Sequence, residues 1–274
     1  EEEGALDRAL ALADARGADL VVANDPDADR LAAATREAGA WRTLTGNDLG
    51  LLLAWGAAEK ATRAGRTGTL ASSLVSTPGL AAIARHYGLG YAETLTGFKW
   101  ISRVPDLMFG FEEALGFLVD PGKVRDKDGI SAARALLGRV LELHGAGATL
   151  SDALEESDLI FGHFASRQIS LRVTRLEEIG EAMERLRRTA PSSIAGIRVL
   201  AVDDLAQGGA LPPSDVLRFR LDEGARLIAR PSGTEPKLKL YLDAAATTGT
   251  VAERRAAAAE VLDRLSEGAR DLLA

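Results

Sequence analysis

Asn24-Asp25-Pro26-Asp27-Ala28-Asp29-Arg30 is the stretch from which the rest of the chain can be interpreted. It follows a short apolar run, Leu20-Val21-Val22-Ala23, which predicts a buried parallel strand because it is β-branched and lacks polar alternation. Carboxylates at alternate positions repel one another unless a cation lies between them. Carboxylate oxygens favour a hard ion such as Mg²⁺, which keeps coordination sites for water or a substrate phosphate. We therefore predict a Mg²⁺ site at Asp25, Asp27 and Asp29.

Other kinds of site also contain closely spaced aspartates. A thiolate or imidazole zinc site is excluded, since the chain has no Cys and only three His. An EF-hand loop needs Gly at its sixth position and Glu at its twelfth, where this chain has Arg30 and Arg36. A phosphatase that uses Asp25 as a nucleophile and a merely solvated acidic turn both remain open.

Composition limits the classes of function. At 274 residues the chain is long enough for about two domains. A net charge of −7 argues against nucleic-acid or anionic-membrane partners. The absence of Cys suits a cytoplasmic protein, and no signal peptide is visible at Glu1-Glu2-Glu3-Gly4. The longest uncharged stretch, residues 67–84, contains Ser, Thr, Pro and Gly, so we expect no membrane-spanning segment.

The periodicity of the chain predicts an α/β fold in three parts. From residue 45 onward, strands and helices alternate, which indicates a mainly parallel α/β domain. Its expected helices are 47–64, a helix from Thr77-Pro78 to His86 or Tyr87, and 129–144. Its expected strands are 69–75, 91–95 and 107–111. Later, strands outnumber helices, which favours a small α+β domain with an antiparallel sheet. Its expected strands are 168–173, 198–202, 216–221 and 227–229, and its expected helices are 177–188 and 251–265.

The opening segment is expected to be part of an incomplete α/β domain. A helix over residues 5–16 and one or two strands cannot bury a parallel sheet on both faces. We therefore interpret the sequence as a fragment. The predicted domains are 1–44, the C-terminal part of an α/β domain that carries the acidic loop, then 45–160, a complete α/β domain, then 161–274, a C-terminal α+β domain.

Two loops of the middle domain carry polar side chains at the carboxyl ends of predicted strands, where open parallel sheets bind ligands. Thr96-Gly97-Phe98-Lys99-Trp100 offers a compact positive charge at Lys99. Gly110-Phe111-Glu112-Glu113-Ala114-Leu115-Gly116 offers acceptors for sugar hydroxyls at Glu112 and Glu113, although such a pair is also common at exposed helix starts. Lys127 either adds another cation or belongs to a capped turn.

The last domain contains Arg230-Pro231-Ser232-Gly233-Thr234-Glu235-Pro236-Lys237. Arg can bind an anion through two N–H groups, the two hydroxyls can donate to it, and Gly lets backbone amides come close. The composition predicts a phosphate-binding loop. An ordinary turn between two strands would explain Pro, Ser and Gly, but not the flanking Arg and Thr.

These motifs, in this order, resemble those of the α-D-phosphohexomutase superfamily of phosphoglucomutases and phosphomannomutases, over essentially the whole chain. The family has four domains around a cleft, and the resemblance implies that this chain carries the end of the second, the third and the fourth. It implies Mg²⁺ ligands at Asp25, Asp27 and Asp29, with Arg30 beside the transferred phosphate.

The resemblance also implies the residues that bind the sugar. Gly97 and Lys99 lie in the loop that reads the sugar's orientation, with Lys99 an acid or base, and Glu112 holds sugar hydroxyls. A further set matches the loop that grips the non-transferred phosphate. That set consists of Arg230, Ser232, Gly233 and Thr234.

Two departures from the family pattern affect the expected activity. The family's phosphoserine loop, of T-A-S-H-N-P type, is not found here, so we expect this chain alone to be inactive. Ala114 stands where the glucose and mannose enzymes have Ser, which resembles the phosphopentomutase-like branch and leaves hexose or pentose open.

The implied reaction interconverts sugar 1-phosphate and 6-phosphate, or 5-phosphate for a pentose, through a phosphoserine and a bisphosphate intermediate. A sugar bisphosphate is the implied activator, and a separate N-terminal chain is a possible partner. The alternative is a non-catalytic phosphosugar-binding remnant or an inactive truncated product.

Overall fold

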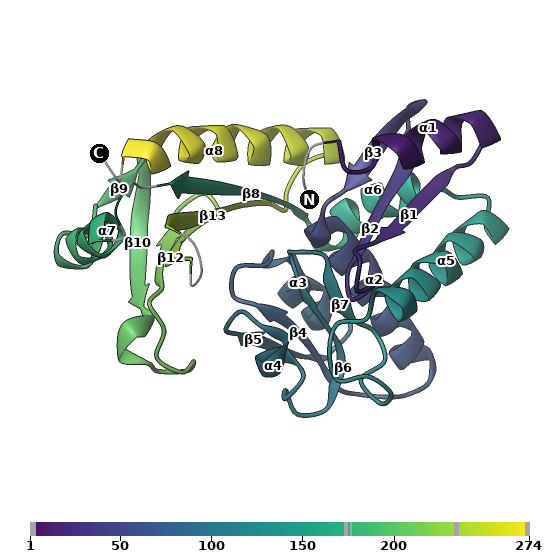
Figure 1. Cartoon of the computed structure of the whole chain (residues 1–274), viewed down its shortest axis with the longest axis horizontal. Coiled ribbons are helices and arrows are strands. Elements are labelled where there is room, and N and C mark those ends of the chain that lie inside the picture. The colour runs from purple at the N-terminus through teal and green to yellow at the C-terminus, as the bar shows by residue number, and fades with distance from the viewer. Residues whose placement is uncertain (1–3, 173–174, 176, 233–235, 272–274) are drawn as a thin grey trace. The chain divides into compact units, whose positions relative to one another are not determined.

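The computed structural model describes residues 4–172, 175, 177–232 and 236–271. The chain divides into two compact units, Glu1–Phe161 and Gly162–Ala274, here called unit 1 and unit 2 (Figure 1). The predicted division into 1–44, 45–160 and 161–274 stays a prediction. Among the described residues, no helix is both long and apolar enough to cross a membrane.

Unit 1 opens with helix α1 (Asp7–Arg16) and a three-stranded sheet in the order β1-β2-β3. Its strands are β1 (Leu20–Asn24), β2 (Leu31–Glu37) and β3 (Ala40–Leu44). The prediction of a buried parallel strand at Leu20–Ala23 is wrong in this structure, because β1 pairs antiparallel with β2 and Val22 is 40% exposed. The short connection 25–30 explains the orientation, since a parallel pair needs a crossover of about a dozen residues.

The second sheet of unit 1 has the order β5-β4-β6-β7. Strand β4 pairs parallel with both β5 and β6, while β6 and β7 form an antiparallel hairpin. This arrangement confirms the predicted mainly parallel α/β class. The strands are β4 (Thr69–Ser73), β5 (Gly90–Thr94), β6 (Leu107–Glu112) and β7 (Gly116–Leu118). The helices are α2 (Gly46–Arg63), α3 (Gly79–His86), α4 (Phe98–Ile101), α5 (Gly129–Gly145) and α6 (Leu150–Phe161).

Helices cover both faces of this sheet. Along β6, a Cβ at Gly110 would meet Ile101 of α4, whereas the ring of Phe111 lies against Gly50 of α2. Neighbouring residues of a strand point to opposite faces, so α2 and α4 lie on opposite sides. Phe109, Phe111 and Phe117 are fully buried in this core. Helix α2 begins with a capping box in which Thr45 and Asp48 bond each other's backbone N–H.

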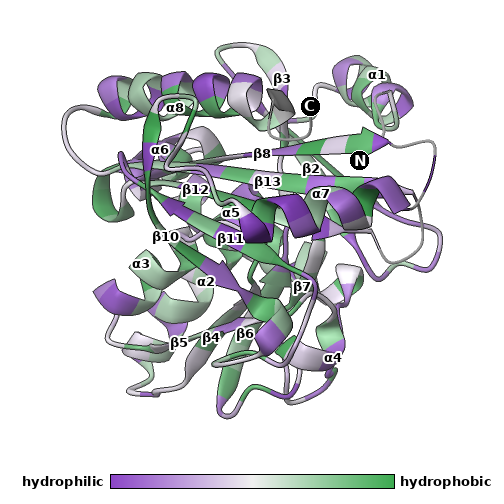
Figure 2. Ribbon diagram, turned by 90° about the vertical axis from the view of Figure 1, so that its left-hand side faces the viewer, coloured by the Kyte–Doolittle hydropathy of each residue, from purple (hydrophilic) through white to green (hydrophobic). Residues whose placement is uncertain are grey.

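Unit 2 is a six-stranded antiparallel sheet in the order β8-β13-β12-β11-β10-β9 with two helices on one face, which confirms the predicted α+β class. Figure 2 shows apolar and polar residues alternating along its strands. The apolar residues pack against the helices. The strands are β8 (His163–Arg172), β9 (Ser193–Ile194), β10 (Ile197–Asp204), β11 (Leu217–Leu221), β12 (Ala225–Pro231) and β13 (Lys237–Ala246). The helices are α7 (Glu177–Arg188), the 3₁₀ turn η1 (Leu205–Gln207) and α8 (Val251–Asp271).

Candidate functional site

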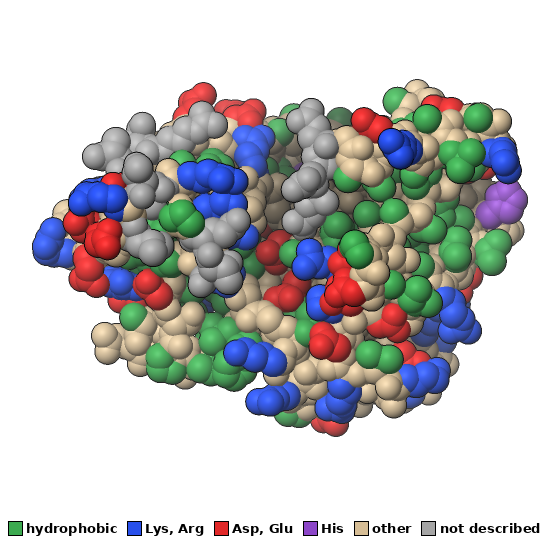
Figure 3. Space-filling view, in the orientation of Figure 1, with side chains coloured by type: hydrophobic (Ala, Val, Ile, Leu, Met, Phe, Trp, Pro, Cys, Tyr) green, Lys and Arg blue, Asp and Glu red, His purple; other side chains and the backbone are tan. Residues whose placement is uncertain are grey.

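The acidic loop that joins β1 to β2 brings its three aspartates together. The Ala28 N–H donates to the Asp25 carbonyl at 2.9 Å, and Ala28 has a left-handed φ of 58°. The loop therefore folds back on itself in a tight turn. As a result, Asp25, Asp27 and Asp29 can each offer an oxygen, with all three oxygens within 4.8 Å of one another. Figure 3 shows acidic and basic side chains close together on one face of the molecule.

The described basic side chains near this loop do not bond every carboxylate oxygen of the three aspartates. Asp29 Oδ2 pairs with the ammonium of Lys127, whereas Asp29 Oδ1 is buried and has no hydrogen-bond partner among the described residues. The Arg30 guanidinium is more distant, with its Nε 3.5 Å from Asp25 Oδ2 and 3.8 Å from Asp29 Oδ1. A buried, unpartnered carboxylate oxygen is costly. The three aspartates therefore fit a hard divalent ion bound through oxygen.

Asp25 in the acidic loop and Lys127, which contacts the loop, both have shifted pKa values. The backbone N–H of Arg30 donates to Asp25 Oδ1 at 3.0 Å and holds the pKa of Asp25 below its ordinary value. Partial burial lowers the pKa of Lys127, but the hydrogen bond and charge of Asp29 outweigh it, so that this pKa lies above its ordinary value. Lys127, predicted as a substrate ligand, therefore contacts a predicted metal ligand here.

Backbone contacts fix the acidic loop on both sides. The Leu31 N–H donates to the Leu115 carbonyl at 3.1 Å, and the Gly129 N–H donates to the Ala28 carbonyl at 3.1 Å. The Asn24 side-chain amide donates to the Arg30 carbonyl at 2.6 Å. A Cβ at Gly129 would overlap that carbonyl, so only glycine fits without movement. The loop thus lies between the β6–β7 hairpin and the start of α5.

The two predicted sugar loops also meet. Glu112 Oε1 accepts a hydrogen bond from the Gly97 N–H at 2.5 Å. Gly97 has a φ of 108°, which disfavours any side chain, and it precedes the short helix α4. Lys99 lies on α4 with an exposed side chain, its Nζ 5.5 Å from the centre of the Trp100 ring. The structure therefore joins Gly97 and Glu112 directly.

Glu113, the other predicted sugar ligand, contacts two serines that the sequence analysis did not assign to the site. Its Oε2 accepts hydrogen bonds from Ser73 Oγ at 3.2 Å and Ser76 Oγ at 3.0 Å. Burial, followed by the neighbouring charge of Glu112, raises the pKa of the Glu113 carboxyl. Only a weak signal in the sequence pointed to these serines, namely polar residues at and just after the end of the largely buried strand β4.

In unit 2, Arg230 lies near the end of β12, in a polar row across the sheet. It is aligned with Lys239 on β13, which is aligned with Ser170 on β8. Their neighbours Ala229 and Leu240 belong to the core beneath the helices, so Arg230 lies on the other face. The Ser232 N–H donates to the Lys237 carbonyl at 2.8 Å. Gly233 and Thr234, both predicted to bind phosphate, lie outside the described residues.

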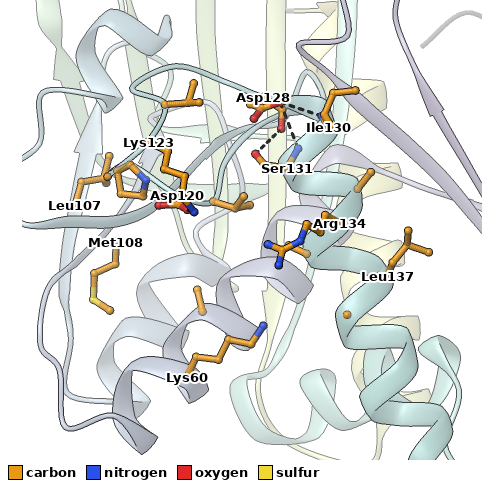
Figure 4. A pocket seen from close by; sticks show the side chains of 18 of the residues that line it. Lys60, Leu107, Met108, Asp120, Lys123, Asp128, Ile130, Ser131, Arg134 and Leu137 are labelled. Atoms are coloured by element: carbon orange, nitrogen blue, oxygen red, sulfur yellow. Dashed lines mark hydrogen bonds and ion pairs between the residues drawn. The ribbon is translucent and has the colours of Figure 1, made fainter.

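A large pocket of unit 1 lies apart from these residues. It has a volume of about 1240 Å³ and is lined by α2, α5, the start of β6 and the segment 119–124. Figure 4 shows Lys60, Arg134 and Leu137 around it, and an ion pair between Lys123 and Asp120. None of the predicted site residues lines it. The candidate site is therefore an open set of loops rather than this pocket.

Two family models match most of the chain. Residues 45–158 match the phosphoglucomutase/phosphomannomutase alpha/beta/alpha domain III. Residues 169–261 match the phosphoglucomutase/phosphomannomutase C-terminal domain. The chain belongs to the α-D-phosphohexomutase superfamily, which confirms the family predicted from the motifs.

Two curated relatives carry mutase names. A probable phosphomannomutase of Haemophilus influenzae is 50% identical over 274 residues, which is 100% of this chain and 54% of the relative. A phosphoglucomutase of Staphylococcus aureus is 34% identical over 265 residues, covering 88% of this chain and 48% of the relative. The chain thus spans about half the length of the curated relatives it matches.

Solved structures share the fold. The pp63/parafusin phosphoglucomutase of Paramecium, in an open form, has a TM-score of 0.69 at 20% identity, with 93% of this chain and 45% of that chain covered. N-acetylphosphoglucosamine mutase of Aspergillus fumigatus, in complex with GlcNAc-6P and magnesium, has a TM-score of 0.52 at 17% identity. That match covers 92% of this chain and 49% of the other.

Proposed function

We propose that this chain forms the metal-binding and sugar-binding part of a phosphosugar mutase. The observation that carries this proposal is the joined set of loops in unit 1. The buried oxygen Asp29 Oδ1, which has no hydrogen-bond partner among the described residues, supports a cation position here, and the loop that holds it is bonded to the hairpin that carries Glu112. A metal position beside acceptors for sugar hydroxyls suits phosphoryl transfer on a sugar.

The proposed ligands of Mg²⁺ are Asp25, Asp27 and Asp29, which can place three oxygens together. Mg²⁺ bound there would neutralise charge on a phosphoryl group. The fungal N-acetylphosphoglucosamine mutase, solved with magnesium, supports this choice of ion. The exposed guanidinium of Arg30, 47% accessible, can contact a phosphate from outside the carboxylate set.

The remaining residues of unit 1 bind and orient the sugar in this proposal. Glu112 accepts hydrogen bonds from sugar hydroxyls, and the Gly97 N–H fixes the direction of its carboxylate. Lys99 donates or takes up the proton of the reacting sugar oxygen, in keeping with its exposed position on α4. These groups position the reacting oxygen, and phosphoryl transfer depends largely on such positioning.

Unit 2 supplies a separate phosphate-binding segment in this proposal. Arg230 and Ser232 offer a guanidinium and a hydroxyl near the end of β12, and Gly233 and Thr234 complete the sequence motif. Arg suits phosphate because its planar fork can donate two parallel hydrogen bonds. This segment would hold the phosphate that is not transferred.

The proposed reaction moves a phosphoryl group between two oxygens of one sugar. A phosphoserine gives its phosphoryl group to a sugar monophosphate, which becomes a bisphosphate. The bisphosphate then returns its other phosphoryl group to the serine. That serine would belong to the part of a mutase that this sequence does not span, so we expect the chain alone to bind the sugar without turnover. A sugar bisphosphate would act as activator.

Calorimetric titration of the purified chain with glucose 1-phosphate and ribose 1-phosphate, with Mg²⁺ present, tests the proposal. A mutase assay containing glucose 1,6-bisphosphate is run beside it. We expect binding without turnover, and the tighter ligand identifies a hexose or pentose preference. Turnover would show that a residue of this chain replaces the serine. Absence of binding to either sugar phosphate would contradict the proposed function.

A further inference from the structure

The hairpin that carries Glu112 is held in a conformation that its own sequence does not favour. Glu112 pairs with Gly116 across the hairpin, so residues 113–115 form its loop. Leu115 has a φ of 65°, which lies in the left-handed region. Residues other than Gly and Asn rarely adopt this backbone conformation. Such a residue persists only where its surroundings fix it. Contacts from outside the hairpin would help to hold Leu115 in this conformation.

Two buried serines on the neighbouring strand and its loop supply these contacts. Ser73 ends β4 and is 1% exposed, and Ser76 follows three residues later and is 2% exposed. Both hydroxyls donate to Glu113 Oε2, and the Glu113 N–H donates back to Ser76 Oγ at 3.1 Å. The two serine oxygens lie 2.8 Å apart. The Ser76 N–H also donates to the Ser73 carbonyl at 3.0 Å, which turns the two hydroxyls to the same side.

Ser73, Ser76 and Glu113, with the hydrogen bonds that join them, are here called the clamp. The residues next to Glu113 connect the clamp to both parts of the candidate site. Glu112, one residue before it, accepts the Gly97 N–H. Leu115, two residues after it, accepts the Leu31 N–H at the end of the acidic loop. We propose that Ser73, Ser76 and Glu113 are positioning residues, which hold Glu112 in place for sugar hydroxyls without touching the sugar. This inference rests on the proposed function and assigns Glu113 a role other than sugar binding.

The clamp should affect sugar binding more than metal binding. Removing a hydroxyl leaves Glu113 with a missing donor in a buried position, so the loop would relax to satisfy its carboxylate. Glu112 is adjacent in sequence and would move with it. The three aspartates lie on the other side of the Leu31–Leu115 bond and keep their own turn.

The test compares serine-to-alanine variants of the whole chain by calorimetric titration with glucose 6-phosphate and, separately, with Mg²⁺. Ser72→Ala is the matched control, because Ser72 is equally buried on β4 but its hydroxyl lies 3.4 Å from the Tyr91 hydroxyl and not against Glu113. We expect Ser76→Ala to weaken glucose 6-phosphate binding about tenfold with unchanged Mg²⁺ affinity. Ser72→Ala should keep the wild-type sugar affinity.

Other outcomes of this experiment distinguish failure of this inference from failure of the proposed function. If wild type and Ser76→Ala bind glucose 6-phosphate equally, the clamp is not a positioning device, although the proposed function stands. An equal loss of Mg²⁺ affinity would show a general loss of structure and overturn the inference as well. No binding by the wild type would overturn both. If Ser76→Ala does not fold, Ser73→Ala gives the same comparison while leaving the Ser76 contacts in place, with a smaller expected loss.

Discussion

The sheets of the two units place their candidate functional groups in different ways. In unit 1 most of these groups lie at or just after the ends of strands β1, β5 and β6, and the turns there depend on backbone conformation at Ala28 and Gly97. In unit 2, Arg230 lies on a strand, and its face follows from simple alternation with the buried Ala229. A site built on loops therefore depends on contacts from distant segments, whereas a site on a strand depends mainly on sheet register.

The largest effect is expected in unit 2, at a buried ion pair on the face of the sheet that carries Arg230. Arg226 donates to Asp243 Oδ2 from Nε at 2.9 Å and from Nη2 at 2.7 Å, and the Asp243 side chain is 2% exposed. Asp243→Ala removes the carboxylate and should lower the free energy of unfolding by about 3–5 kcal/mol, measured by urea unfolding. Arg198→Ala is the control, since the Arg198–Asp222 pair is exposed and should contribute about 1 kcal/mol or less. Similar losses for both variants would contradict a larger contribution from the buried Arg226–Asp243 pair.

The loop contacts of unit 1 predict the next largest effect, at a glycine. Gly129→Ala would drive a Cβ into the Arg30 carbonyl and the Asn24 amide, and should lower the free energy of unfolding by about 3 kcal/mol. Gly138→Ala lies in the same helix with nothing within 4 Å of the added Cβ, and should stabilise the chain by about 0.5–1 kcal/mol. Urea unfolding of the two variants gives both values. Equal stability of the two would mean that the acidic loop is not fixed by close backbone contact.

Arg230→Ala tests whether the two units bind separate parts of the substrate. Loss of a guanidinium that holds a phosphate should weaken glucose 1-phosphate binding by at least about tenfold, because charge-assisted hydrogen bonds contribute about 1.5–3 kcal/mol. The Mg²⁺ affinity should remain that of the wild type, since the aspartates belong to unit 1. Arg198→Ala removes the same charge from unit 2 and serves as control. Parallel losses of sugar and Mg²⁺ binding would contradict separate roles.

A smaller effect is expected in the pH dependence of stability. Burial and Glu112 raise the pKa of Glu113 above its ordinary value, so the folded chain holds this proton more tightly than the unfolded chain. The stabilisation from that proton is complete below the unfolded pKa of about 4.3 and is lost as pH rises through the higher folded pKa. Glu113→Gln, which cannot ionise, should therefore gain thermal stability relative to wild type as pH rises above the unfolded pKa and through the higher folded pKa. Melting temperatures across this range measure it, and a pH-independent difference would contradict the raised pKa.

Local patterns predicted several elements closely. The polar and apolar periodicity of residues 177–188 predicted α7 with the bounds that the structure has. The helix predicted at 129–144 begins at the same residue as α5, since Asp128 accepts hydrogen bonds from Ile130 and Ser131 as an N-cap. The alternate spacing of Asp25, Asp27 and Asp29 indicated that their oxygens could converge, and they do.

The same local patterns could not predict which segments distant in the sequence contact one another. The short apolar β1 looked like a parallel strand, and its antiparallel partner became visible only in the structure. Helix α6 was not predicted. The contacts of Glu113 with Ser73 and Ser76 span 40 and 37 residues, and no periodicity of one segment reports a partner so distant. Lys127 was noted as a cation, but its pairing with Asp29 depends on where the turn before α5 lies.

We propose above all that the acidic loop of unit 1 binds a divalent cation. Anomalous X-ray scattering from crystals of the chain soaked in Mn²⁺, which can replace Mg²⁺ at oxygen ligands, tests it most directly. We predict one strong peak at about 2.0–2.3 Å from carboxylate oxygens of Asp25, Asp27 and Asp29, and its loss in Asp27→Asn. A loop without a peak, or a peak at other carboxylates that survives Asp27→Asn, would contradict the claim.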